Sequence, residues 1–169
     1  MEKRTTKWDG QVLALAGKEI KVGDTAPDAT LVARDLTAKK LSDWDGQIKV
    51  LLAMPSMDTP VCQSQVRQFN KDAVDFADDV VVIALSTDLP FAQERFCAAE
   101  GLDRVVTLSD HKTAEFGEKY GYLIPDLRLF SRGVVIVDRD NVVRYIEYVP
   151  EANDQVDFAK ALEALKKLK

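Results

Sequence analysis

The sequence lacks an excess of positive charge, a block of like charge and a long apolar segment. Lys and Arg together number 23 against 28 Asp and Glu, for a net charge of -5, whereas nucleic-acid-binding proteins normally present a basic face. The longest apolar run, residues 80–85, is far too short to cross a bilayer, and residues 1–10 lack the apolar core of a signal peptide. We therefore expect a cytoplasmic protein with no nucleic-acid partner and no membrane partner.

Cysteine and histidine are also scarce, with two cysteines and one histidine in 169 residues. A lone histidine, His111, cannot supply the cluster of ligands that a metal site needs, so we expect no bound metal. Cysteines in a reducing compartment are not expected to form a permanent structural bridge. Cys62 and Cys97 should therefore be either buried apolar residues or reactive groups.

What the sequence does contain is the composition of a folded globular protein, 46% hydrophobic and 30% charged. No internal repeat, low-complexity segment or linker rich in Gly, Ser or Pro divides it. Its length is suited to one domain with a single sizeable core. We expect residues 1–169 to form a single domain.

Hydrophobic patterns and turn residues predict the strands. Continuous apolar segments, typical of strands that are buried on both faces of a sheet, occur at residues 48–54 and 80–86. The other predicted strands are a short one at 105–108, a hairpin of 133–137 and 142–149, and an N-terminal hairpin of 7–14 and 18–22.

Apolar residues at helical spacing predict a helix at residues 61–77, directly after the first buried strand. Pro90 is suited to the first turn of the next helix and Gly101 to its end, with Thr87 or Asp88 as the cap. Two further helices are predicted at 113–120 and 154–168.

The order strand, helix, strand, helix, strand, followed by an antiparallel hairpin and a closing helix, indicates an α/β protein. Its central sheet is expected to be mixed and flanked by helices. This order resembles the thioredoxin-like fold, with the N-terminal β-hairpin as an extension. A fold alone does not define a function, so the function must be inferred from particular residues.

Cys62 is the first candidate, because it falls in the first turn of the helix predicted at 61–77. Unpaired N–H groups and the positive end of the helix dipole favour an anion there. A thiolate is such an anion, and it is the nucleophilic form of cysteine. A free cysteine is also commonly a small buried hydrophobic residue, and position alone leaves both interpretations open.

Two residues in the preceding loop add to the case for chemistry. Thr59 carries a hydroxyl that can accept and donate hydrogen bonds three positions before Cys62. Pro55 fixes the chain where it leaves the strand and removes a backbone donor. The loop thus places a hydroxyl and a helix N-terminus around one sulfur. Alternatively, Asp58 or Thr59 is simply the N-cap of the helix.

The pattern Pro55-x-x-x-Thr59-x-x-Cys62 resembles the active-site signature of the peroxiredoxin superfamily. The longer string PSMDTPVCxxQVRxFN is similar to the thiol peroxidase branch of that superfamily in particular. Two further blocks match in the same order: FAQERFCAAEGLDRVVTLSD, which contains Cys97, and SRGVVIVD, which contains Arg132. The resemblance covers essentially the whole chain, including the N-terminal hairpin.

This resemblance implies a role for each matched residue. Cys62 would attack the peroxide, and Arg132 would bring a charged, planar fork to the sulfur and the peroxide. Thr59 would orient the peroxide, the Cys62 amide would donate to it, and Pro55 would shield the oxidised sulfur. Cys97 would be the resolving cysteine, which forms an intramolecular disulfide with Cys62. Without the resemblance, Arg132 would be interpreted as a solvated residue at a strand end and Cys97 as a core residue.

The implied activity is that of an atypical 2-Cys peroxiredoxin, which reduces hydrogen peroxide and organic hydroperoxides without a cofactor in antioxidant defence. The resemblance also implies thioredoxin as the reductant and a homodimer as the assembly. Two alternatives stay open: a redox sensor that uses the same cysteine pair as a switch, and a protein that exchanges thiols with disulfides. The cysteines do not form a C-x-x-C motif, which argues against a thioredoxin-like dithiol reductase.

Overall fold

The computed structural model describes residues 3–168, in which a seven-stranded mixed sheet has the order β11-β10-β5-β6-β7-β3-β4. β5, β6 and β7 are parallel, β10 runs antiparallel to β5, and β3 runs antiparallel to β7. β5 is buried at every position because both faces of the sheet are covered. The strands are β3 Thr30–Val32, β4 Ala38–Lys40, β5 Ile48–Ala53, β6 Val80–Ser86, β7 Val105–Ser109, β10 Gly133–Val137 and β11 Val143–Tyr148.

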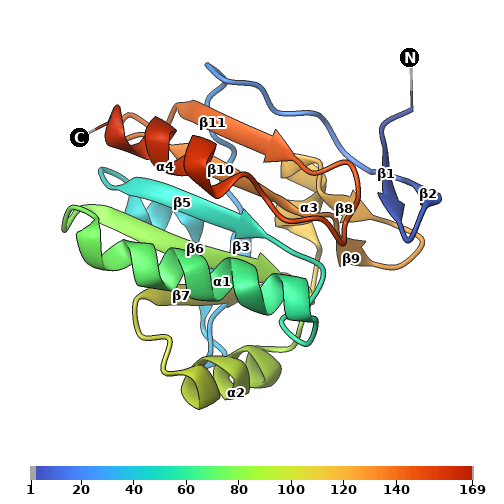
Figure 1. Ribbon diagram of the computed structural model, residues 1–169, viewed down its shortest axis with the longest axis horizontal. Helices are drawn as coiled ribbons and strands as arrows, with labels where there is room; N and C mark the ends of the chain where they lie inside the picture. The colour runs from blue at the N-terminus through green and yellow to red at the C-terminus, as the bar shows by residue number, and fades with distance from the viewer. Residues whose placement is uncertain (1–2, 169) are drawn as a thin grey trace.

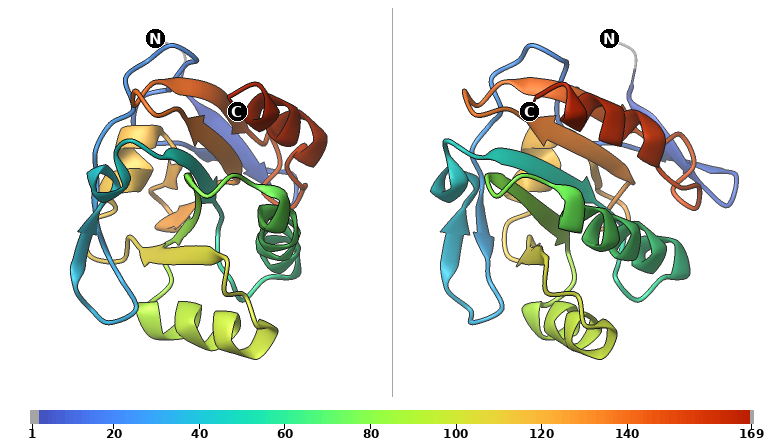
Figure 2. Two further views of the ribbon diagram at one scale, coloured as in Figure 1. Left: turned by 90° about the vertical axis from the view of Figure 1, so that its left-hand side faces the viewer. Right: turned by 60° about the vertical axis from the view of Figure 1, so that its left-hand side comes forward.

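Helices cover both faces of the sheet, with α1 and α4 on one face and α3 on the other (Figures 1 and 2). α2 lies beyond β7, at the lower end of the molecule in Figure 1. None of the helices in the described part of the chain has the length and apolar character of a membrane span. The helices are α1 Pro60–Asp72, α2 Pro90–Glu100, α3 Glu115–Tyr120 and α4 Phe158–Lys166, with 3-10 turns at Leu41–Trp44 and Ala73–Asp75.

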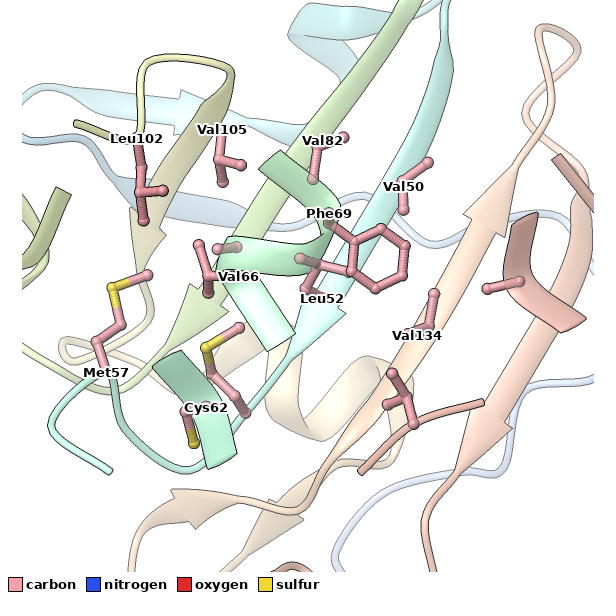
Figure 3. Packing of buried hydrophobic residues seen from close by; sticks show 14 of the residues in the cluster. Val50, Leu52, Met57, Cys62, Val66, Phe69, Val82, Leu102, Val105 and Val134 are labelled. Carbon is pink, nitrogen blue, oxygen red and sulfur yellow. The ribbon is translucent and has the colours of Figure 1, made fainter. Parts of the chain in front are cut away.

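Two hydrophobic cores lie on opposite faces of the sheet, because successive side chains of a strand point in opposite directions. In β5, Leu52 belongs to the core under α1 and α4, whereas Leu51 belongs to the core next to α3. Figure 3 shows part of the first core, where Phe69 and Val66 of α1 pack over β5 and β6. Both cysteines belong to this first core, so the chemistry of the chain is concentrated on one face of the sheet.

The predicted N-terminal hairpin is present, but its strands differ from the predicted ones. β1 is Thr5–Trp8 and β2 is Gln11–Ala14. The turn consists of Asp9 and Gly10, whose φ angles are 49° and 79°, and Asp-Gly is the pair that such a tight hairpin turn favours. Residues 18–22 form no strand. The prediction placed the turn too late because it overlooked the Asp-Gly pair.

α2 begins and ends where the sequence predicts, but its cap differs. Pro90 is the first helical residue, and Gly101 ends the helix in the left-handed region with a φ of 64°. The N-cap is Leu89, and the helix has no side-chain cap bond. The prediction that Thr87 or Asp88 caps the helix was therefore wrong. The carboxylate of Asp88 makes other hydrogen bonds, which are described below.

The remaining differences concern element ends and very short strands. α1 ends at residue 72 and continues as a 3-10 turn, and α4 begins at Phe158, after the predicted residue 154. β3 and β4 were not predicted, because three residues are too few to show an alternating pattern. The same holds for the two-residue strands β8 Leu123–Ile124 and β9 Leu129–Phe130.

Asp110, directly after β7, makes the stability of the fold depend on pH. It is 2% exposed. Burial raises the pKa of its carboxyl to about 6, although the hydrogen bond from the Gly117 amide acts in the opposite direction and lowers that pKa. Because the folded pKa is raised, this group stabilises the fold below about pH 4, and the contribution is lost as pH rises through about 6. The loss corresponds to about 3 kcal/mol.

We expect Asp110→Asn, which keeps an oxygen for the Gly117 amide, to become more stable relative to the parent as pH rises from 4 to 7. Urea unfolding of both proteins across this range measures the difference, and the exposed Asp103→Asn is the control. A difference in unfolding free energy that stays constant with pH would contradict this prediction.

Candidate active site

Strand pairing brings Arg132 to the start of α1. β10 runs antiparallel to β5 with Gly133 opposite Ala53, the last residue of β5. Arg132 directly precedes Gly133, so it lies beside the point where the chain leaves β5 and enters the loop to Cys62. A Cβ on Gly133 would overlap the carbonyl oxygen of Glu147 in β11. Only glycine therefore allows the close strand packing that fixes the position of Arg132.

Cys62 lies in the first turn of α1, with an exposed fraction of 0%. Figure 3 shows it at the start of the helix, near Met57 and Val66. Two polar groups reach its sulfur: Oγ1 of Thr59 lies 2.7 Å from Sγ, and Nη2 of Arg132 donates to Sγ over 3.1 Å. A purely apolar cysteine needs neither group, so the arrangement favours the reactive interpretation over the apolar one.

Arg132 is 1% exposed, which excludes the alternative of a solvated residue at a strand end. Its Nε donates to the carbonyl oxygen of Ala152 over 2.9 Å, and its Nη1 donates to Oε1 of Gln65 over 2.8 Å. Within residues 3–168 it forms no ion pair with a carboxylate. A buried charge without a counter-charge is costly, and the sulfur is the group beside it that can become an anion.

Gln65 is a site residue that the sequence analysis did not identify. It lies on α1 three positions after Cys62 and is 0% exposed. Its Oε1 accepts from Arg132, and its Nε2 donates to the carbonyl oxygen of Gly133 over 3.2 Å. Gln65 therefore fixes the guanidinium plane against the sulfur. The available signal was a polar residue on the same helical face as Val66 and Phe69, one turn from the cysteine.

Thr59 occupies the N-cap position of α1, but its side chain makes no capping bond. The hydroxyl lies instead 2.7 Å from Sγ of Cys62 and 3.0 Å from the carbonyl oxygen of Ser56. A hydroxyl has one hydrogen, so it donates to one of these acceptors at a time. It can thus donate either to an anionic sulfur or to the loop. Pro55 is buried in the same loop.

Cys97 lies near the end of α2, is 2% exposed, and carries a free thiol, as Cys62 does. Burial raises the pKa of the Cys97 thiol, and the positive charge of Arg34 opposes this rise. The neutral thiol that burial favours is a poor nucleophile. The structure therefore brings Thr59 and Arg132 to the sulfur of Cys62 and leaves Cys97 as a protonated, buried group in another helix.

The arrangement defines the class of site. In the described part of the chain, no group of three His, Cys, Asp or Glu side chains could hold a metal ion. The fold is thioredoxin-like, and the site consists of a cysteine at a helix N-terminus with a hydroxyl and a guanidinium on its sulfur. Such groups activate a thiol and stabilise negative charge that develops next to it. This is the site of a thiol-based redox protein.

Comparisons with known proteins agree with this class. Residues 21–165 match the Redoxin family. Thiol peroxidase of Oceanobacillus iheyensis is 49% identical over 155 residues, which cover 92% of this chain and 94% of that protein. Thiol peroxidase of Bacillus subtilis is 45% identical over 159 residues, 94% of this chain and 95% of that protein. The crystal structure of a peroxiredoxin-like protein from Aquifex aeolicus has a TM-score of 0.91 at 35% identity, with 98% of each chain covered.

The chain therefore belongs to the Redoxin family. Within that family it is a peroxiredoxin of the thiol peroxidase type, a thiol-dependent peroxidase on a thioredoxin-like fold. The predicted fold class, the N-terminal hairpin and the resemblance to thiol peroxidases are confirmed.

Proposed function

We propose that this enzyme reduces hydrogen peroxide and organic hydroperoxides by direct attack of the Cys62 thiolate. The sulfur forms a bond to one peroxide oxygen while the O–O bond breaks. The other oxygen leaves and takes up a proton as water or an alcohol, and Cys62 becomes a sulfenic acid. The observation that carries this proposal is the buried guanidinium of Arg132, which lies 3.1 Å from the sulfur and pairs with no carboxylate in residues 3–168.

The surrounding groups act on the charge of the transition state, which is spread over the sulfur and both oxygens. Arg132 stabilises that charge more strongly than it stabilises the bound peroxide, because the charge on the oxygens develops as the bond breaks. The Cys62 amide lies in the first turn of α1, where N–H groups have no partner within the helix, so it can donate to the peroxide. Thr59 orients the peroxide, and Pro55 shields the sulfenic acid from a second oxidation.

Cys97 then resolves the sulfenic acid. Its sulfur bonds to the sulfur of Cys62, the S–O bond breaks, and the oxygen leaves as water with the proton of the Cys97 thiol. Cys97 is buried, its thiol pKa is raised, and it lies on another helix than Cys62. We therefore expect α2 to open locally for this step, and helix ends are the segments that open most easily. A dithiol protein, thioredoxin, reduces the disulfide by thiol–disulfide exchange.

Steady turnover tests this proposal. With thioredoxin, thioredoxin reductase and NADPH, we expect the parent to consume NADPH continuously when peroxide is supplied. Cys97→Ser should consume one equivalent of peroxide and then stop, because no disulfide forms for thioredoxin to reduce. With one equivalent of peroxide, intact-mass spectrometry should show a sulfenic acid on Cys62. Continuous turnover by Cys97→Ser would show that Cys97 is not the resolving residue.

The hydroxyl of Thr59 gives a second test. Thr59→Val keeps the shape and removes the hydroxyl. A hydrogen bond to a charged group contributes about 1.5–3 kcal/mol, so we expect the peroxide reaction to slow roughly 10- to 100-fold. Thr59→Ser retains the hydroxyl and should stay within a few-fold of the parent. Equal rates for Val and Thr, measured by single-turnover kinetics, would exclude a role for the hydroxyl in the reaction.

The compartment, the domain organisation and the assembly of the enzyme are also proposed. We propose a cytoplasmic antioxidant enzyme in which residues 1–169 form one domain and two copies form a homodimer. The match covers 94% and 95% of the length of two curated thiol peroxidases, which supports a single domain. Sedimentation of the reduced protein tests the dimer.

A further inference from the structure

Asp88 lies between the two segments that carry the cysteines. It is half-buried and lies midway between the last residue of β6, Ser86, and the first residue of α2, Pro90. An aspartate at this place is expected to cap the helix, yet Leu89 is the N-cap and no side chain caps the helix. The carboxylate of Asp88 therefore does not cap α2, and its hydrogen bonds go to other groups.

The carboxylate binds the loop that leads to Cys62. Its Oδ1 accepts from the Ser56 hydroxyl over 2.7 Å, and its Oδ2 accepts from the Met57 amide over 2.8 Å. The carbonyl oxygen of Ser56 in turn accepts from the amide of Thr59 over 3.2 Å and lies 3.0 Å from its hydroxyl. Asp88 thus holds the loop in the conformation that places the Thr59 hydroxyl on the sulfur of Cys62.

The same carboxylate is connected to the helix that carries Cys97. Its Oδ2 also accepts from the hydroxyl of Ser86 over 2.7 Å, and Oγ of Ser86 accepts from Nε2 of Gln93 over 3.1 Å. Gln93 lies on α2, one turn before Cys97, and both Gln93 and Ser86 are 0% exposed. These four residues form a polar relay: Gln93, Ser86, Asp88 and Ser56.

Only one of the two polar side-chain atoms of Gln93 has a hydrogen-bond partner among the described residues. Its Nε2 also donates to the carbonyl oxygen of Leu108 over 3.0 Å, but its Oε1 is buried without a hydrogen-bond partner among the described residues. A buried polar atom without a partner destabilises the state that buries it. The docked position of α2 is therefore weakened at the residue that begins the relay, and opening of α2 releases the Ser86 hydroxyl from Gln93.

We propose that Asp88 is a positioning residue that couples the docking of α2 to the order of the Cys62 loop. While α2 is docked, the relay holds Thr59 on the sulfur and the site is ready for peroxide. When α2 opens for disulfide formation, the relay loosens and the loop is released together with the helix. This inference rests on the proposed roles of Cys62 and Cys97.

Amide exchange provides a test that does not depend on activity. Gln93→Leu removes the relay's contact on α2, far along the chain from Cys62. We expect faster amide exchange in residues 56–62 as well as in α2, relative to the parent. Gln68→Leu is the matched control, because Gln68 donates only to Asp72 of its own helix in the bonds of the described residues. Faster exchange confined to α2 would overturn the coupling.

Kinetics of the two steps provide the second test. We expect Asp88→Ala to slow the peroxide reaction about tenfold or more, since bonds to a charged group are lost, and to leave disulfide formation as fast as in the parent or faster. Asp88→Asn should recover most of the peroxide rate. An amide oxygen can still accept from Met57 and Ser86, and the amide N–H₂ can donate to the Ser56 hydroxyl.

The controls separate this proposal from the proposed function. The exposed Asp126→Ala should react as the parent does. Equal slowing of both steps in Asp88→Ala, or an Asn variant as slow as Ala, would overturn the positioning role. Should Asp88→Ala fail to fold, Gln93→Leu and Asp88→Asn still decide the question. A parent protein that shows no Cys62-dependent peroxide reaction would instead refute the proposed function, whatever the exchange data show.

Discussion

Replacement of Cys62 by serine is expected to reduce peroxide turnover to the level of the protein-free reaction while the fold stays intact. The two side chains are nearly isosteric, so the buried position at the start of α1 accepts serine with little strain. A hydroxyl, however, is far less acidic and less nucleophilic than a thiol, so neither Thr59 nor Arg132 can make it react with peroxide.

Peroxide consumption and thermal unfolding of Cys62→Ser should be measured side by side. Cys97→Ser is the matched control, because it makes the same substitution in the same hydrophobic core. It should keep the first reaction with peroxide and lose only the continued turnover. Turnover of more than a few per cent of the parent rate in folded Cys62→Ser would mean that another group attacks the peroxide.

Arg132→Lys is expected to slow the reaction of Cys62 with peroxide by ~10²–10³-fold, the usual effect of losing one well-placed donor to a developing negative charge. Lysine keeps the positive charge but has a single ammonium, whereas arginine donates to Ala152, Gln65 and the sulfur at once. The ammonium can contact one of these groups well, so the transition state loses its planar, fixed partner.

Single-turnover kinetics at several peroxide concentrations measure this effect, and the melting temperature shows whether the variant is folded. Arg128→Lys is the matched control, because Arg128 is exposed and donates to the carbonyl oxygens of His111 and Lys112. It should react at the parent rate. An Arg132→Lys variant that is folded and as fast as the parent would show that Arg132 has only a structural role.

Much of the architecture follows from local sequence patterns. β6 has the predicted bounds and β5 differs by one residue, because a continuous apolar segment is a strong strand signal. Gly101 ends α2 because glycine adopts the left-handed conformation of a helix C-terminus without strain. The N-terminal hairpin was placed wrongly although its signal, Asp9-Gly10, was present in the sequence.

The chemistry of Cys62 was partly determined by the sequence as well. A cysteine in the first turn of a helix after a buried strand is a local feature, and so is the hydroxyl of Thr59 three positions before it. These two residues are close in the chain, so their contact depends on a single turn. Local sequence therefore indicated a candidate nucleophile and one of its partners, although it also allowed Cys62 to be a buried apolar residue and Thr59 to be a cap.

The tertiary structure decided which distant groups surround that sulfur, and of these the family resemblance had implied Arg132 alone. The pairing of β10 with β5 brings Arg132 to Cys62, and the polar face of α1 brings Gln65 to Arg132. Likewise, Asp88 has the local sequence of a helix cap, but packing turns its carboxylate towards the Cys62 loop. Such contacts join residues far apart in sequence, and a local pattern carries no information on which distant group will be buried against it. Strand register and burial supply that information, because a buried charge or carboxylate must find its partners wherever the fold places them.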